Sequence, residues 1–121
     1  MKVIIDLIED IRESIGNAEA YTLRAGLLRE DVKDTSTLIY AGEAPIGSFA
    51  LDIQKKELLF SIDGGQDVLT VGALIPQLLI LDMAAMMYPL RIDVNRQYKG
   101  IEVVGFGKSD EEKVYTLFIK I

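Results

Sequence analysis

The clearest pattern along the chain is an apolar stripe within its first fifteen residues. Apolar side chains recur there at spacings of three and four, at Ile4, Leu7, Ile8, Ile11 and Ile15. This spacing places them on one face of an α-helix. Acidic residues stand away from the stripe, at Asp6, Glu9, Asp10 and Glu13. We therefore predict an N-terminal amphipathic helix whose acidic side is either plain solvated surface or a docking face for a basic partner.

From residue 20 onward the pattern changes to an alternation of apolar and polar positions, which is typical of β-strands. Apolar residues alternate over 21–27, and a polar break over 30–37 leads into a further apolar run at 38–40. Two more strands, at 49–53 and 58–62, are expected to form a hairpin. Placing Ile53 opposite Leu58 puts both apolar sets on one face of it. Ser48, Asp52 and Asp63 then fall on the opposite, polar face.

An apolar segment runs from Val68 to Leu90, and Asp82 is its one formal charge. A segment of this length is able to cross a bilayer. A carboxylate in hydrocarbon costs about 2.5 to 3.5 kcal/mol, however, and strand-like segments flank both sides. We therefore predict one long buried helix that Pro89 ends. Its carboxylate is expected at a solvent edge, neutralised, or paired with a base such as Arg24, Arg29 or Arg91, with partial burial as the preferred arrangement.

Three further strands are predicted at 90–97, 101–106 and 113–121. The order of first helix, three or four strands, long helix and three strands indicates an α+β fold with two layers, in which an antiparallel sheet carries the helices. A length of 121 residues corresponds to a single domain over 1–121. In coarse element order, the stretch from Ile46 to the C-terminus with the first helix added is similar to profilin-like and roadblock-type regulatory modules. That similarity implies a dimeric adaptor.

Composition removes several kinds of chemistry. The chain contains no histidine and no cysteine, so an imidazole base, a thiolate nucleophile, Cys/His zinc sites and disulfides are excluded. We expect no metal and no cofactor. Nineteen acidic residues stand against 13 basic ones, for a net charge of −6. This balance argues against direct nucleic-acid binding, which rests on clustered lysine and arginine. Early acidic residues interrupt any signal-peptide-like run, so a cytoplasmic location is expected.

The long apolar segment supplies a second candidate site. Asp82, Met83, Met86 and Met87 are expected at a dimer or ligand interface, because methionine fills cores and adaptable binding surfaces alike. Two-sided apolar elements predict a homo-oligomer without membrane contact. The sequence thus favours a non-catalytic protein–protein interaction module, an adaptor, regulator or inhibitor, whose acidic first helix meets another protein with a basic surface. The alternative is a small-molecule-binding protein or minor enzyme that uses carboxylates on the polar face of the sheet.

Overall fold

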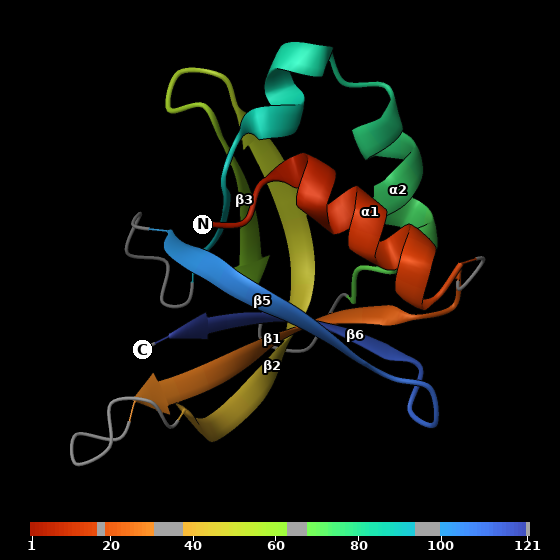
Figure 1. Cartoon of the computed structure of the whole chain (residues 1–121), viewed down its shortest axis with the longest axis vertical. Coiled ribbons are helices and arrows are strands. Elements are labelled where there is room, and N and C mark those ends of the chain that lie inside the picture. The colour runs from red at the N-terminus through yellow and green to blue at the C-terminus, as the bar shows by residue number, and fades with distance from the viewer. Residues whose placement is uncertain (17–18, 31–37, 63–67, 94–99, 121) are drawn as a thin grey trace.

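The fold is an α+β barrel, shown in Figure 1. The computed structural model describes residues 1–16, 19–30, 38–62, 68–93 and 100–120. In chain order the elements are α1 (Ile4–Ser14), β1 (Thr22–Glu30), β2 (Leu38–Asp52), β3 (Glu57–Ile62), α2 (Val71–Leu79), the 3-10 helix η1 (Met83–Met87), β4 (Leu90–Asp93), β5 (Ile101–Ser109) and β6 (Val114–Lys120). Each strand pairs with the next along the chain, and β6 closes the barrel against β1. The predicted α+β class is confirmed.

The sheet is mixed and not wholly antiparallel. Strands β1 and β6 pair in parallel, as do β3 and β4, whereas the other four neighbouring pairs are antiparallel. A parallel pair needs a crossover connection, and α2 with η1 provides it between β3 and β4. The prediction of an antiparallel sheet is therefore wrong at two pairs. Alternation within a strand shows which face is buried, but not the direction of the neighbouring strand.

The apolar segment over 68–90 does not form one long buried helix. Thr70 caps the start of α2 by accepting a hydrogen bond from the backbone N–H of Ala73, and α2 ends at Leu79. The chain then turns and forms η1, after which Leu90 pairs with Leu58 on β3. An uninterrupted helix would carry the chain away from that strand. Within the described residues, every helix is too short or too polar to cross a lipid bilayer.

The apolar stripe of α1 is buried, which confirms the predicted amphipathic helix. Ile4, Leu7, Ile8 and Ile11 are at most 2% exposed. They share one core with side chains from the barrel strands and from α2. Helix α1 packs against α2, η1 and β5, and Figure 1 shows the two α-helices over the same side of the barrel. Burial of this stripe is the main hydrophobic contribution of α1 to the fold.

Register in the β2–β3 hairpin differs from the prediction by two residues. Leu51 lies opposite Leu58, and Asp52 lies opposite Glu57. A shift of two preserves the faces, because side chains alternate with a period of two along a strand. It also places Ile53 in the turn, where its side chain is 71% exposed. The expectation that Ile53 joins the buried face is therefore wrong.

The barrel consists of two halves that repeat the same backbone pattern. Three backbone hydrogen bonds, written N–H to O, occur twice: Ile4 to Tyr88 matches Val71 to Tyr21, Leu90 to Lys2 matches Leu23 to Leu69, and Lys2 to Val103 matches Leu69 to Ile46. In the region of the helices and first strands, equivalent residues are 67 positions apart, as from Lys2 to Leu69 and from Tyr21 to Tyr88. The unit α1-β1-β2-β3 thus corresponds to α2-β4-β5-β6.

The hairpins that end the two halves are also equivalent. Register irregularities occur between Ile46 and Ser48 on β2 and between Val103 and Gly105 on β5. A lysine with positive φ ends each turn, Lys56 at 55° and Lys113 at 53°. These positions lie 57 apart, since the first half is longer by residues of the β1–β2 connection. The repeat allows each surface position to be compared with its counterpart.

Candidate functional site

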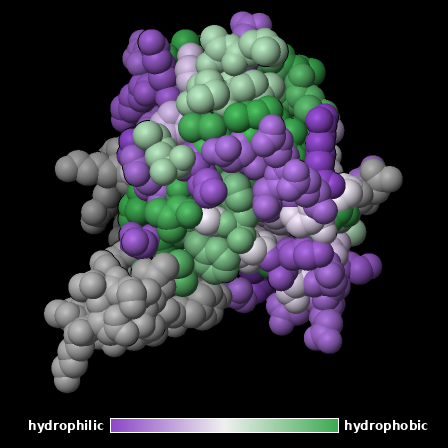
Figure 2. All heavy atoms as spheres, in the orientation of Figure 1, coloured by the Kyte–Doolittle hydropathy of each residue, from purple (hydrophilic) through white to green (hydrophobic). Residues whose placement is uncertain are grey.

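Five large apolar side chains are exposed around the junction between α2 and η1 and in the facing β2–β3 turn. We call this set the apolar surface; its members are Ile53, Leu79, Ile80, Met83 and Met87. Ile80 and Met83 are 82% and 88% exposed. Figure 2 shows green spheres gathered at the end of the molecule where Figure 1 places η1. Scattered exposed apolar residues are ordinary, but a contiguous group marks an interaction site.

A hollow of about 290 Å³ opens within the apolar surface. Ile53 from the hairpin turn lines one part of it, and Ile80, Leu81 and Ala84 line another. Tyr88 lies deeper along the same wall and is half-buried. The hollow is therefore bounded by two segments that are distant in sequence, the β2–β3 turn and the α2–η1 junction.

Asp82 also lines this hollow and is exposed to solvent. It stands at the N-cap position of η1, but its side chain makes no capping hydrogen bond. Arg24 pairs with Glu43, and Arg91 pairs with Glu57 and Glu102; Arg29 lies outside the residues whose side chains are described. The predicted partial burial of Asp82 is wrong, because the helix that would have enclosed it ends at Leu79.

The three methionines predicted beside Asp82 divide into two groups. Met83 and Met87 are exposed on η1, whereas Met86 is half-buried and packs against the core. The tight turn of a 3-10 helix accounts for this division, because side chains three residues apart share a face. Residues 83 and 86 are three apart in sequence, yet Met83 begins η1 and projects beyond it. The structure thus brings Asp82, Met83 and Met87 to one exposed region.

The internal repeat shows that the barrel does not require this apolar surface. A shift of 67 positions equates Leu79 with Arg12 and Ile80 with Glu13, and both charged residues are exposed. Met83 corresponds in the same way to the exposed Gly16. Equivalent places in the fold are thus charged or small in the first half and large and apolar in the second. Sequence reasoning missed this comparison, although Tyr-Thr-Leu-Arg at 21–24 and Tyr-Pro-Leu-Arg at 88–91 signal the repeat.

The acidic side of α1 separates into two structural and two unengaged carboxylates. Asp6 accepts a hydrogen bond from the backbone N–H of Val3 at 2.9 Å and so caps the helix. Asp10 accepts one from the hydroxyl of Tyr115 at 2.5 Å. Glu9 and Glu13 are exposed, and neither makes an ion pair or hydrogen bond with any described residue. These four side chains line a shallow hollow of about 160 Å³ with Lys2 and Phe106.

Tyr115 makes Asp10 part of the fold and not only of the surface. Its side chain is fully buried. Burial raises the pKa of Tyr115, and the hydrogen bond to the Asp10 carboxylate raises it further. The charged tyrosinate would lose solvation and face a negative neighbour. An isolated tyrosine in a strand pattern gave no signal of this contact.

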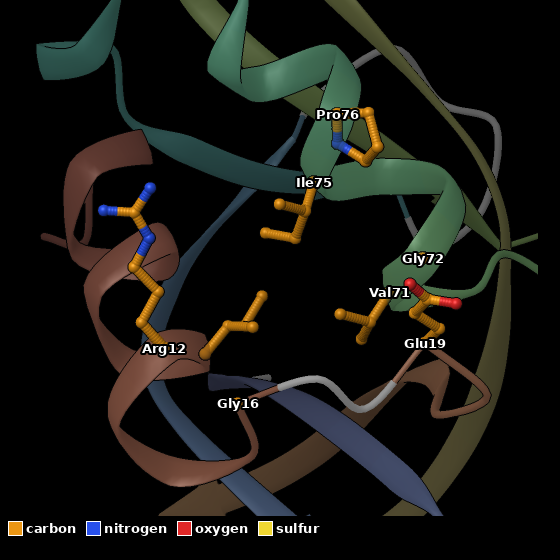
Figure 3. Close-up of a pocket in the computed structure, with 8 residues that line it drawn as sticks. Arg12, Gly16, Glu19, Val71, Gly72, Ile75 and Pro76 are labelled. Carbon is orange, nitrogen blue, oxygen red and sulfur yellow. The ribbon is translucent and has the colours of Figure 1, made fainter.

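A third hollow, of about 230 Å³, lies between α1 and α2 and is shown in Figure 3. Val71 and Ile75 point into it, while Arg12 and Glu19 stand on opposite sides. The first N–H groups of α2 do not offer an anion site there. Those of Val71 and Gly72 already donate to the carbonyls of Tyr21 and Glu19.

The carboxylates proposed for catalysis on the sheet are largely engaged in structural contacts. Asp52 accepts a hydrogen bond from the backbone N–H of Lys55 at 2.9 Å, which stabilises the hairpin turn. Glu57 and Glu102 both pair with Arg91. Asp63 lies outside the described residues. Among the side chains that the structure places, no group of three or more carboxylates is arranged to hold a metal ion.

Comparisons of the chain with protein-family models, with curated proteins and with solved structures give no match. Similarity in element order to profilin-like and roadblock-type modules stays an expectation from sequence. Function must therefore be argued from the surfaces themselves, because a fold class does not determine an activity.

Proposed function

We propose that this chain is a non-catalytic, cytoplasmic protein–protein interaction module that forms a homodimer through the apolar surface. One observation carries the proposal: Leu79, Ile80 and Met83 are exposed where the equivalent positions of the first half hold Arg12, Glu13 and Gly16. Exposing large apolar side chains has a free-energy cost in water. Since the fold accepts charged residues at equivalent positions, a role in binding explains the apolar ones.

The test is replacement of Ile80 by the residue type found at its counterpart. Ile80→Glu should leave the fold intact, because Glu13 occupies the equivalent exposed position. It should weaken self-association at least tenfold, since burying Ile contributes about 1.5 to 3 kcal/mol and 1.4 kcal/mol is a factor of ten. Sedimentation equilibrium measures the dimer dissociation constant, and circular dichroism checks folding.

Val104→Glu is the matched control. Val104 is also an exposed apolar residue, but it lies on β5 outside the apolar surface. Its replacement introduces the same charge and should leave the dissociation constant unchanged. A parent chain that stays monomeric at high micromolar concentration would refute the proposed homodimer, and equal weakening by both variants would refute the assigned surface.

A second binding face is proposed on α1 for a protein with a basic surface. Its support is that Glu9 and Glu13 are exposed and unengaged among the described residues, in a chain of net charge −6. Glu9→Gln combined with Glu13→Gln removes these charges without touching the Asp6 cap or the Asp10–Tyr115 bond. Binding to an immobilised polylysine probe should weaken in this variant and with rising salt. Unchanged binding at low salt would remove α1 as the face.

The alternative of a small-molecule-binding protein or minor enzyme has less support. Asp52, Glu57 and Glu102 already hold a turn or an arginine. A deep pocket with converging polar groups would favour that alternative. The polar hollow on α1 is shallow, and the two larger hollows are lined mainly by apolar or small residues.

A further inference from the structure

We infer that the apolar surface is an isologous interface, in which a second copy of this chain binds the same face about a two-fold axis. Met83 of each copy enters the 290 Å³ hollow of the other, and Lys55 of each copy faces Asp82 of the other. This inference rests on the proposed function and specifies the geometry of the homodimer. An isologous interface requires one face to carry both members of every complementary pair.

Shape complementarity is the first support. Met83 projects from η1 with 88% of its surface exposed, and the hollow begins at its sequence neighbours Asp82 and Ala84. A cavity of about 150 Å³ is sufficient to hold benzene, so a hollow of 290 Å³ has room for an unbranched methionine side chain. Methionine adapts readily to such irregular space. A projection and a receptacle therefore stand side by side on one face.

Charge complementarity is the second support. Lys55 and Lys56 form the exposed tip of the β2–β3 turn, next to Ile53 at the edge of the hollow. Asp82 lies on the opposite segment lining that hollow. A two-fold rotation exchanges these two segments between copies, so each lysine-bearing turn meets the Asp82 side of the other chain. The same face would repel a second copy if its charges were all of one sign.

The acidic character of the rest of the chain makes these lysines informative. The chain carries a net charge of −6, and the equivalent turn at 110–113 reads Asp-Glu-Glu-Lys. The hairpin turn beside the apolar surface is thus basic, whereas its counterpart in the second half is acidic. Two net-negative chains repel at long range, and this local opposition of charges would offset that repulsion where they meet.

The experiment is charge reversal with rescue, measured as dimer dissociation constants by sedimentation equilibrium at low salt. Asp82→Lys and Lys55→Glu should each weaken the dimer by about five- to thirtyfold, because each removes two symmetry-related pairs worth roughly 0.5 to 1 kcal/mol apiece. The double variant should regain parental affinity. A mixture of the two single variants should form a heterodimer tighter than either homodimer, because both cross-pairs then have opposite charges.

Glu112→Lys and Lys120→Glu are the matched controls, since they make the same net-charge changes at exposed sites away from the apolar surface. Neither should show rescue by the other. A parent dimer that both single reversals leave unchanged, or that the double variant fails to restore, would overturn the isologous geometry while self-association stands. A parent chain that never dimerises would overturn the proposed function as well, so the two failures are distinguishable.

Discussion

Two tyrosines make the same contact in different surroundings. Tyr115 donates to Asp10 and Tyr21 donates to Asp110, each at 2.5 Å. The first pair connects the buried barrel to α1, whereas the second lies on the surface beside Lys108. Because desolvation decides what such a bond contributes to stability, the two hydroxyls differ in importance despite equal distances.

Tyr115→Phe should lower the free energy of unfolding by about 1.5 to 3 kcal/mol, the range for hydrogen bonds to charged groups. The change removes one hydroxyl and keeps the ring contact with Phe106. Urea unfolding followed by circular dichroism measures it. Tyr21→Phe is the control and should leave stability nearly unchanged. Equal losses in the two variants would show that burial does not distinguish these bonds.

Alkaline pH should test the raised pKa of Tyr115. Above the ordinary tyrosine pKa of 10.0 the unfolded chain releases this proton while the folded chain keeps it. The unfolded state then binds fewer protons, so the free energy of unfolding falls as pH rises. This residue contributes a slope of about 1.4 kcal/mol per pH unit, and its contribution is constant below pH 10. Tyr115→Phe lacks that proton.

The expected result is that the stability advantage of the parent over Tyr115→Phe shrinks as pH rises from about 10 to 11. Urea unfolding at a series of pH values gives the difference directly. Other groups that titrate there affect parent and variant alike. A difference that stays constant across this range would mean that Tyr115 titrates in the folded chain like a solvent-exposed tyrosine.

At the level of elements, the parallel contact between β1 and β6 depends on a missing side chain. Gly26 lies opposite Phe118, and a Cβ at position 26 would come within 2.5 Å of the Phe118 ring and 2.9 Å of Thr116. The Phe118 ring also lies against Gly107 on β5. Glycine at position 26 thus allows the strands that close the barrel to carry a large aromatic residue between them.

Gly26→Ala should lower the free energy of unfolding by about 1 to 3 kcal/mol, because the added methyl group overpacks this contact. Gly105→Ala is the matched control on β5, where an added Cβ meets nothing within 4 Å. That variant should be neutral or more stable by up to about 1 kcal/mol through the unfolded state. Thermal and urea unfolding compare them, and equal stabilities would show that Phe118 moves aside at little cost.

For the whole molecule, two equivalent halves share one core but present opposite surfaces. α1 exposes Glu9 and Glu13, while α2 and its extension expose Ile80 and Met83 at or near the corresponding places. Association through the second surface binds the folded chain and not the unfolded one. By mass action it must stabilise the fold as concentration increases.

The thermal midpoint of the parent should therefore rise with chain concentration. A hundredfold excess of concentration over the dissociation constant corresponds to about 2.7 kcal/mol of stabilisation for a simple ligand. Ile80→Glu should show a midpoint that is independent of concentration over the same range. Differential scanning calorimetry at several concentrations measures both, and a flat profile for the parent would contradict coupling between folding and association.

Local pattern determined several features by itself. The spacing of Ile4, Leu7, Ile8 and Ile11 gave α1 and its buried face, because a helix places such residues together whatever surrounds it. Alternation gave the strands and the apolar face of the β2–β3 hairpin. The absence of histidine and cysteine excluded whole classes of chemistry. Each of these conclusions depends on residues near one another in sequence.

Tertiary structure decided what depends on distant neighbours. Strand direction, barrel closure and the division of the 68–90 segment follow from where Leu90 must pair with Leu58. Asp10 became structural only because β6 brings Tyr115 beneath it. The apolar surface appeared because α2 ended early and left Ile80 and Met83 outside the core. Hydrophobic pattern determines which residues favour burial, but contacts between distant segments determine which of them are covered.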